Sequence, residues 1–434
     1  MNKRILQLAI PNIISNITIP LLGMVDIGLM GHLDDPVYMG AIGLGTTVLN
    51  IIYWTFAFLR ISTVGLTAQA FGKKNFRETS IVLSRAILIA FIAGILIIFF
   101  RKPIANLSFI FIKGSNLVEL YAKQYFYIRI VAAPATIGLL VLTGWFIGMQ
   151  NTKTPMYIAL IANILNIVFN FIFVKGLDMK SDGVAYGTVL AQYGGLIFGI
   201  IVLLKYYKKV IVKWTYKKMI EFKDMGKFFK LNADVFVRMI AIIFVFTFFN
   251  FKSAEFGDDI LALNNILLQF FFFFSFLADG FAIAGEALVG KYIGAKDMVN
   301  IKIVIKYLFY WGFGIAIFFS ILYIFCGKYL MLVLTNIDTI IELGSHYKYW
   351  IWILPVVTVM AFIWDGIYIG ATATKAMRNT MLFASLLVFY PLFLLLENKY
   401  QNHALWISFL IFMFTRGLLQ TFIFRKAILS RIDN

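Results

Sequence analysis

One carboxylate lies within the first long apolar run of the chain. Residues 5–31 contain Asp26 and no other charged side chain. An ionised carboxylate at membrane depth costs roughly 3 kcal/mol, so an acidic residue in such a place generally serves a function. The position therefore favours proton or cation coupling, with a fixed polar contact to another helix as the structural alternative.

Two prolines make the same run bendable. Pro11 and Pro20 each lack the amide proton of the helical hydrogen-bond ladder, so the helix is interrupted where they stand. A titratable group on a helix that can bend is the minimum equipment of an ion-coupled transporter. We therefore predict Asp26 as the coupling residue and the two prolines as its hinge.

Uncharged oxygen ligands follow in a later apolar run of the same half. Asn166 and Asn170 are one helical turn apart and share a face, and Thr188 lies on the next run. Beside the Asp26 carboxylate, their oxygens predict a proton site or a small cation site. Hydrogen bonds between helices, the commoner use of asparagine in membranes, are the alternative.

Asp279 and Asp365 stand among aromatic residues in two further runs. Their surroundings read FLADGF and FIWDGIY. A carboxylate beside aromatic ring faces suits an organic cation. We predict a substrate site or a second coupling site at these two residues.

The remaining charges at membrane depth are predicted to be structural. Asp234 and Arg238 are four residues apart, so they can pair on one helix face. Arg60, Arg129 and Arg416 do not release a proton at physiological pH, and we expect them at interfaces or gates rather than in coupling.

Membrane-spanning helices are needed to position these residues. Hydrophobic residues make up 61% of the 434 residues and charged residues only 14%, which excludes a soluble globular protein. About 20 apolar residues suffice to cross a bilayer core. The sequence therefore predicts an all-α polytopic membrane protein with twelve spans, near 5–31, 38–71, 79–100, 119–149, 154–175, 184–206, 228–251, 259–293, 301–325, 345–371, 377–396 and 403–425.

The basic residues indicate the topology of the chain. The net charge is +18, and its lysines and arginines lie in short segments between the apolar runs rather than on one amphipathic face. They are concentrated in alternate loops, which is typical of the cytoplasmic side. The pattern argues against nucleic-acid binding and predicts that both termini are cytoplasmic.

An internal repeat divides the chain into two halves. We predict an N-lobe of six helices at 1–206, a basic cytoplasmic linker at 207–227 and a C-lobe of six helices at 228–434. Because six is even, the halves are parallel and related by a pseudo-two-fold axis along the membrane normal. Glycines and lysines coincide at an offset of 222 residues: Gly72 with Gly294, Gly144 with Gly366, Gly148 with Gly370 and Lys153 with Lys375.

Other function classes lack their motifs. The stretch GEALVGKY at 285–292 approaches a phosphate-binding loop, but Tyr292 replaces the hydroxyl residue that binds magnesium. The three histidines lack metal-ligand spacing, no GxSxG sequence occurs, and a single cysteine excludes an internal disulfide. We therefore predict neither an enzyme nor a cofactor-dependent protein.

Five stretches resemble the multidrug and toxic compound extrusion (MATE) family, specifically its DinF branch. They read PLLGMVDIGLMGHL at 20–33, FLRISTVGLTAQA at 58–70, GWFIGMQ at 144–150, DGFAIAGEALVG at 279–290 and DGIYIGAT at 365–372. The resemblance implies twelve helices in two lobes and export of small organic compounds in exchange for H⁺ or Na⁺. It also implies a multi-pass protein of the bacterial inner membrane, which we expect to be a monomer.

The resemblance assigns roles to residues already singled out. Where many members have a second acid, this chain has Asn170, so the N-lobe site holds one carboxylate. An amide can give an oxygen to Na⁺ but cannot take up a proton, which favours protonation of Asp26 while leaving Na⁺ open. The family's first-helix acid and bending proline, its amide, acid and hydroxyl positions, and its tenth-helix acid fall on Asp26, Pro11, Asn166, Asn170, Thr188 and Asp365.

Two other functions stay open at this point. A flippase for lipid-linked precursors, a relation of the same superfamily, would need a cationic cavity to hold pyrophosphate. A channel or membrane scaffold would show no coupling to an ion gradient.

Overall fold

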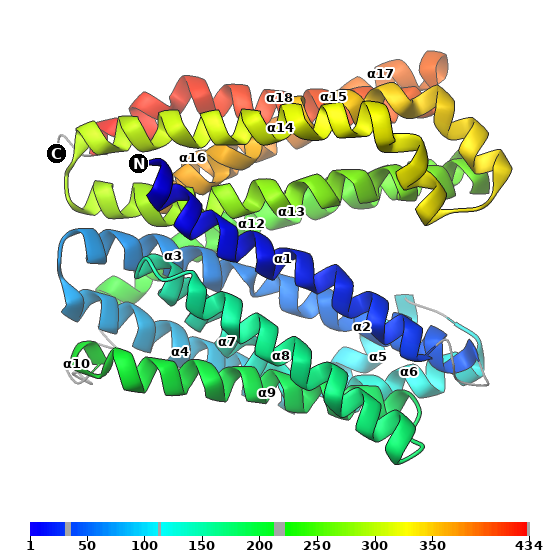
Figure 1. Ribbon diagram of the computed structural model, residues 1–434, viewed down its shortest axis with the longest axis horizontal. Coiled ribbons are helices and arrows are strands. Elements are labelled where there is room, and N and C mark those ends of the chain that lie inside the picture. The colour runs from blue at the N-terminus through cyan, green and yellow to red at the C-terminus, as the bar shows by residue number, and fades with distance from the viewer. Residues whose placement is uncertain (31–35, 112–113, 212–221, 432–434) are drawn as a thin grey trace. The chain divides into compact units, whose positions relative to one another are not determined.

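The computed structural model describes residues 1–30, 36–111, 114–211 and 222–431, with side chains except those of 19–30, 111, 222–225, 227–229 and 431. Helices are the only regular secondary structure in these ranges (Figure 1). Large apolar side chains such as Phe99, Val333 and Leu395 are exposed on them, as expected of helices that contact lipid. The prediction of an all-α polytopic membrane protein is confirmed.

The chain forms two compact units. One comprises residues 11–225, and the other comprises residues 1–10 together with 226–434. Helix α1 (Asn2–Met30) therefore begins in the second unit and continues in the first from Pro11 onward. The predicted lobe boundaries stay a prediction, and residues 212–221 of the predicted linker lie outside the described residues.

Long helices fill the unit of residues 11–225, drawn from blue to green in Figure 1. Helix α3 packs on α7, α4 on α7, α8 on α9, and α2 on α6. A 3₁₀ turn at Ile130–Ala132 joins α6 to α7, and a π turn at Ile172–Gly176 ends α8. The helices are α2 (Pro36–Thr55), α3 (Ala57–Gly72), α4 (Phe76–Phe99), α5 (Arg101–Phe111), α6 (Asn116–Arg129), α7 (Ala133–Gly148), α8 (Lys153–Phe171), α9 (Ser181–Tyr206) and α10 (Lys208–Ile211).

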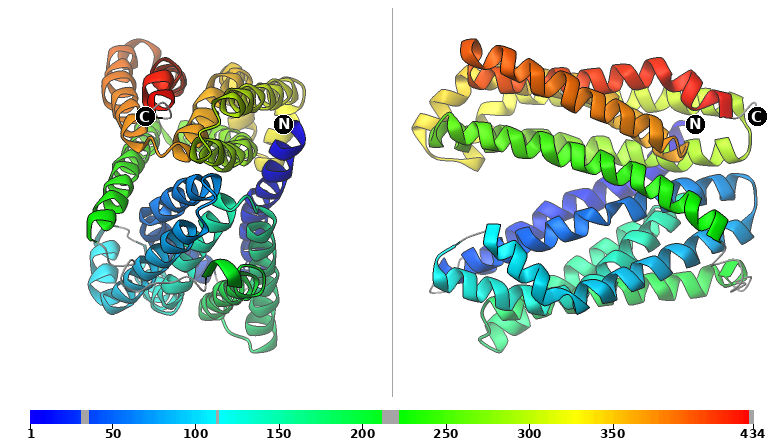
Figure 2. Two further views of the ribbon diagram at one scale, coloured as in Figure 1. Left: turned by 90° about the vertical axis from the view of Figure 1, so that its left-hand side faces the viewer. Right: turned by 180° about the vertical axis from the view of Figure 1, so that it is seen from behind.

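The second unit repeats this arrangement with longer helices. Helix α13 packs on α15, α14 on α15, and α15 and α17 on α18. The view from behind shows α16 and α17, in orange, beside the red α18 (Figure 2). A π segment at Phe383–Phe389 lies between α16 and α17. The helices are α12 (Phe222–Glu255), α13 (Asp258–Gly294), α14 (Met298–Leu334), α15 (Asp338–Gly370), α16 (Thr374–Leu382), α17 (Tyr390–Tyr400) and α18 (Asn402–Ala427), followed by a 3₁₀ turn at Leu429–Arg431.

The predicted spans agree closely with these helices. Eleven spans among the described residues are long and apolar enough to cross a membrane. The long runs predicted near 38–71 and 119–149 are each two helices in line, α2 with α3 and α6 with α7. Helix α5 was not predicted, because its eleven residues begin with two basic ones and are too short to span.

Matching helix contacts confirm the internal repeat. In the first unit, a Cβ built at Gly144 of α7 would stand 2.7 Å from the backbone oxygen of Arg60 on α3. In the second unit, a Cβ at Gly366 of α15 would overlap the backbone oxygen of Ala282 on α13. Each residue of one contact is 222 positions from its counterpart in the other. The repeated glycines are therefore points where two helix backbones touch.

The turns between helices repeat as well. Lys74 and Lys296, 222 positions apart, both adopt a left-handed conformation with φ of 56°. The next residues cap the following helices: Asn75 accepts a hydrogen bond from the Glu78 amide at 3.1 Å, and Asp297 accepts one from the Asn300 amide at 3.0 Å. The Asn300 side chain and backbone amide hold the pKa of Asp297 below its ordinary value.

Candidate functional site

The first predicted site residues lie on α1. Helix α1 is continuous through Pro11, which is buried. The side chains of Pro20 and Asp26 lie outside the described residues, so their surroundings stay predictions. The unit of residues 11–225 nevertheless contains both this part of α1 and the predicted amide ligands.

Asn166, Asn170 and Thr188 form one hydrogen-bonded group, here called the amide cluster. Asn170 Nδ2 donates to Asn166 Oδ1 at 3.0 Å, and Asn166 Nδ2 donates to Thr188 Oγ1 at 3.0 Å. Thr188 Oγ1 in turn donates to the Val184 carbonyl at 2.8 Å. The three side chains are only 2%, 2% and 7% exposed. The structure thus brings these predicted residues together, and it also contains the helix-to-helix hydrogen bonds of the alternative.

A glycine allows this close packing. Gly187 of α9 precedes Thr188, and a Cβ built there would overlap the Oδ1 atom of Asn170 and stand 3.0 Å from its backbone nitrogen. Helices α8 and α9 therefore approach closely at the cluster. Because the chain of bonds fixes which way the amides point, the group offers a preorganised set of neutral oxygens at membrane depth.

Asp365 lies at the centre of a second buried group, here called the ion cluster. Its Oδ2 accepts hydrogen bonds from Arg238 of α12 and from Nη2 of Arg416 of α18, the latter at 2.7 Å. Its Oδ1 accepts one from Gln420 Nε2 at 3.1 Å. The side chains of Asp365, Arg238 and Arg416 are 10%, 8% and 5% exposed. Three helices of one unit are thereby tied together by a single carboxylate.

The ion cluster changes what Asp365 can do chemically. A carboxylate held by two guanidinium groups is already neutralised, so it can accept a cation only after one arginine moves away. Asp279, half-buried on α13, interacts electrostatically with Arg416. Two arginines thus face two acids, and the formal charge of the group is balanced. The Nε atoms of Arg238 and Arg416 are buried and have no hydrogen-bond partner among the described residues.

The expected pairing of Asp234 with Arg238 is wrong. Asp234 Oδ1 instead accepts a hydrogen bond from Arg378 Nη1 at 2.6 Å, and its Oδ2 accepts one from the Thr374 hydroxyl at 3.1 Å. Arg238 pairs with Asp365. Both partners come from other helices because α12 is packed among them, and tertiary neighbours outweigh an exposed i,i+4 contact worth about 0.5 kcal/mol.

The two other predicted structural arginines lie in the first unit. Arg129 Nη1 donates to Tyr125 Oη at 2.6 Å and to Thr46 Oγ1 at 3.0 Å. The bond to Thr46 connects α6 to α2, whereas Tyr125 lies on α6 itself. Arg60 is half-buried on α3, and Gly144 of α7 packs against its backbone.

Sequence reasoning missed Arg416 and Gln420 as partners of Asp365. Their spacing indicated a polar neighbour, because two polar residues one turn apart lie on one face of an apolar span, but it did not identify that neighbour. Among the residues with described side chains, no three histidine, cysteine or acidic side chains come together as a metal site.

Comparisons with known proteins agree with this geometry. The MatE family pattern matches residues 11–172 and 235–394. DNA damage-inducible protein F of Escherichia coli (strain K12) is 36% identical over 425 residues, which are 98% of this chain and 92% of that protein.

Two solved structures have the same fold. One is MATE in the bent conformation, with a TM-score of 0.89 and 17% identity over 99% of this chain and 96% of that one. The other is the outward-facing conformation of a multidrug resistance MATE family transporter of the MOP superfamily, with a TM-score of 0.86 and 17% identity over 100% and 97% of the two chains. The predicted two-lobe fold of twelve helices is confirmed.

Proposed function

Because the chain belongs to the MATE family of multi-pass membrane transporters, we propose that it is a secondary active antiporter that exports small organic compounds in exchange for H⁺ or Na⁺. Members of this family are transporters rather than enzymes, as predicted. Relatives are described in bent and in outward-facing conformations. Such alternation of conformations supports export by alternating access.

The amide cluster is the observation that carries this proposal. It provides buried neutral oxygens within the unit that also holds residues 11–30 of α1. Neutral oxygens can solvate a proton carrier or a cation, but a carboxylate must supply the negative charge. We assign that role to Asp26, with Asn166, Asn170 and Thr188 as its supporting ligands.

Protonation of Asp26 is the coupling event that we favour. The amides and the hydroxyl among the four predicted ligands cannot take up a proton, so Asp26 is the one titratable group of the site. A useful conformational bias needs a few kcal/mol, and moving one carboxylate between dry and wet surroundings supplies about that. Pro11, where α1 passes from one compact unit to the other, and Pro20 are the proposed hinge.

The charges of the ion cluster support export over a lipid-precursor flippase. A flippase needs surplus positive charge to hold pyrophosphate, whereas Arg238 and Arg416 are matched by Asp365 and Asp279. We retain Asp279 and Asp365 as the proposed substrate site or second coupling site.

The remaining features of the proposal concern topology. We propose a monomer in the inner membrane, with both termini and the linker at 207–227 in the cytoplasm and with lobes at 1–206 and 228–434. The cytoplasmic placement of the termini and the linker rests on the concentration of lysine and arginine in alternate loops.

Substrate efflux from proteoliposomes tests the mechanism. A fluorescent organic cation is loaded, and either a proton gradient or a sodium gradient is imposed alone. We expect efflux to follow the proton gradient, to be lost in Asp26→Asn and to be weakened in Asn170→Ala. Asn163→Ala is the matched control, because it is the same change on the same helix outside the hydrogen-bonded cluster.

Two results would overturn parts of this proposal. Full gradient-driven efflux in Asp26→Asn at equal membrane expression would remove Asp26 from coupling. Efflux that follows only the sodium gradient, with Asn170→Ala as damaging as Asp26→Asn, would replace the proton by Na⁺ bound at the same residues.

A further inference from the structure

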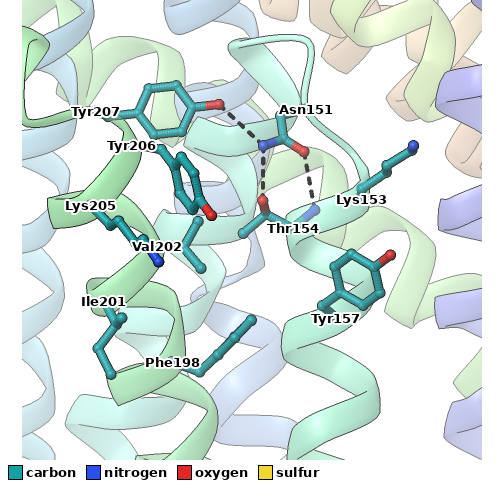
Figure 3. A pocket seen from close by; sticks show the side chains of 10 residues that line it. All are labelled: Asn151, Lys153, Thr154, Tyr157, Phe198, Ile201, Val202, Lys205, Tyr206 and Tyr207. Carbon is teal, nitrogen blue, oxygen red and sulfur yellow. Dashed lines mark hydrogen bonds between the residues drawn. The ribbon is translucent and has the colours of Figure 1, made fainter.

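A pocket lies between α8 and α9 at the end of these helices where α8 begins and α9 ends. Its volume is about 530 Å³, within the range of small-molecule sites. Figure 3 shows Lys205 reaching toward the middle of the pocket, with the Tyr206 hydroxyl nearby and Phe198 closing the floor. Lys153 and Tyr157 line the rim on the α8 side, where the Lys153 side chain points away from Lys205 in this view. The proposed transport mechanism does not use this site.

One wall of the pocket is fixed by its own contacts. Asn151 Nδ2 donates to Thr154 Oγ1 at 2.8 Å and to Tyr207 Oη at 3.1 Å, and its Oδ1 accepts a hydrogen bond from the Thr154 amide at 3.1 Å. The Tyr207 ring packs edge-on against Trp145, with centroids 5.1 Å apart. The pocket is therefore preformed, and a ligand would lose little free energy in ordering it.

The charge of the lining is positive. Its ten residues include Lys153 and Lys205 and no carboxylate. Neither lysine forms an ion pair within the described part of the chain, and Lys205 Nζ lies only over the Tyr206 ring, at 5.6 Å. Further lysines, Lys208 and Lys209, follow on α10, which contacts both α4 and α9. An anion entering the pocket would meet the unpaired charge of Lys205, with that of Lys153 at the rim.

The surface beside the pocket is apolar. Ile197, Ile201 and Leu204 on α9 and Ile164 on α8 are all exposed, as expected of side chains that face acyl chains. Tyr157 and Tyr206, which line the pocket together with the lysines, are exposed as well. Tyrosine prefers the boundary between headgroups and hydrocarbon, so the pocket has the polarity profile of one leaflet.

The geometry points to a binding site for the phosphodiester headgroup of an anionic phospholipid in the α8–α9 pocket. Lys205 contacts the phosphate, Tyr206 lies beside it, Lys153 adds positive charge at the α8 rim, and the acyl chains follow the exposed face of α8 and α9. Basic pockets between transmembrane helices bind anionic headgroups on this principle. A bound lipid would connect α8 and α9, the two helices that form the amide cluster, and so stabilise the unit of residues 11–225.

Lipid titration of the purified full-length protein tests this site. Native mass spectrometry in a mild detergent counts bound dioleoylphosphatidylglycerol against dioleoylphosphatidylcholine, and thermal unfolding is followed in parallel. We expect the anionic lipid to bind preferentially and to raise the unfolding temperature. In Lys153→Gln/Lys205→Gln we expect about 10- to 30-fold weaker binding of the anionic lipid and loss of that rise.

Lys208→Gln/Lys209→Gln is the matched control, because it removes the same charge near the pocket without changing its lining. Equal weakening in this control would mean general surface attraction and would overturn the site, as would equal binding of the two lipids by the wild type. A third arm uses inorganic phosphate and glycerol 3-phosphate without lipid. If these give the same lysine-dependent rise in unfolding temperature, the pocket takes a free anion and the lipid assignment is wrong.

Discussion

Replacing Asp365 by asparagine should destabilise the protein strongly, whatever it does to transport. The carboxylate accepts three hydrogen bonds, two of them from arginines whose side chains are 8% and 5% exposed. Asparagine keeps one acceptor oxygen but removes the negative charge. Breaking a buried ion pair in this way costs about 3–5 kcal/mol, because an uncompensated charge stays buried.

A second substitution separates the cost of the unpaired buried charge from the other effects of Asp365→Asn. In Asp365→Asn/Arg238→Met the missing acid is matched by a missing arginine, and Asp279 remains to balance Arg416. We expect this double variant to regain at least about 1.5 kcal/mol relative to Asp365→Asn, as coupled residues in contact do. Asp178→Asn is the control for the chemical change alone. Its side chain is 93% exposed, and we expect less than about 0.5 kcal/mol there.

Equilibrium unfolding in mixed micelles, with denaturing detergent as the variable and tryptophan fluorescence as the signal, gives these free energies. The reasoning is refuted if Asp365→Asn unfolds at the same detergent fraction as Asp178→Asn, or if removing Arg238 as well makes the protein less stable still. The outcome also decides how transport data are interpreted. Lost efflux in Asp365→Asn would implicate the residue in transport only when equal amounts of folded protein are compared.

Three further predictions concern packing and caps. Gly366→Ala should lower the free energy of unfolding by about 2 kcal/mol, because its methyl group meets backbone, whereas Gly314→Ala, with open space around it, should raise it by about 1 kcal/mol; detergent unfolding measures both. Gly187→Ala should separate α8 from α9 at the amide cluster and reduce ion-coupled efflux in proteoliposomes at unchanged expression. Asp297→Ala should lower the free energy of unfolding by about 1 kcal/mol at neutral pH, because it removes the cap of α14. The pKa of the Asp297 carboxyl is lowered in the folded protein, so the ionised carboxylate stabilises the fold only at pH values above that pKa. The difference in stability between Asp297→Ala and the wild type should therefore vanish as the pH falls through it. Asn75→Ala removes the equivalent cap of the first half, made by a side chain that does not itself titrate, and should also cost about 1 kcal/mol at neutral pH.

Hydrophobic runs and the internal repeat made most of the fold predictable from sequence. Apolar length decides whether a helix spans, and this property is local, so the limits of α9 and α13 lie within three residues of those predicted. The offset of 222 residues even predicted equivalent packing, because a glycine at a helix crossing has no acceptable substitute.

The pairing of charges could not be predicted in the same way. Asp234 and Arg238 are one helical turn apart, yet each pairs with a residue more than 100 positions away in the sequence. Asp234 pairs with Arg378, and Arg238 pairs with Asp365. In a bundle every charge has several helices beside it, and sequence spacing describes only one of them. The amide cluster was predictable because Asn166 and Asn170 bond to each other within one helix.

The repeated helix crossing has a consequence for how the two halves can differ. Turns, caps and glycine contacts coincide at 222 residues, but the polar clusters do not: Asp365 corresponds to Thr143, and Asp26 corresponds to Phe248. The backbone contacts that hold each half together are thus independent of its polar residues, so the halves share one scaffold and carry different chemistry. An aspartate at position 143 would stand where the second half has its arginine-bound carboxylate, but the positions equivalent to Arg238 and Arg416 are Asn16 and Gly194, so it would have no guanidinium partner there.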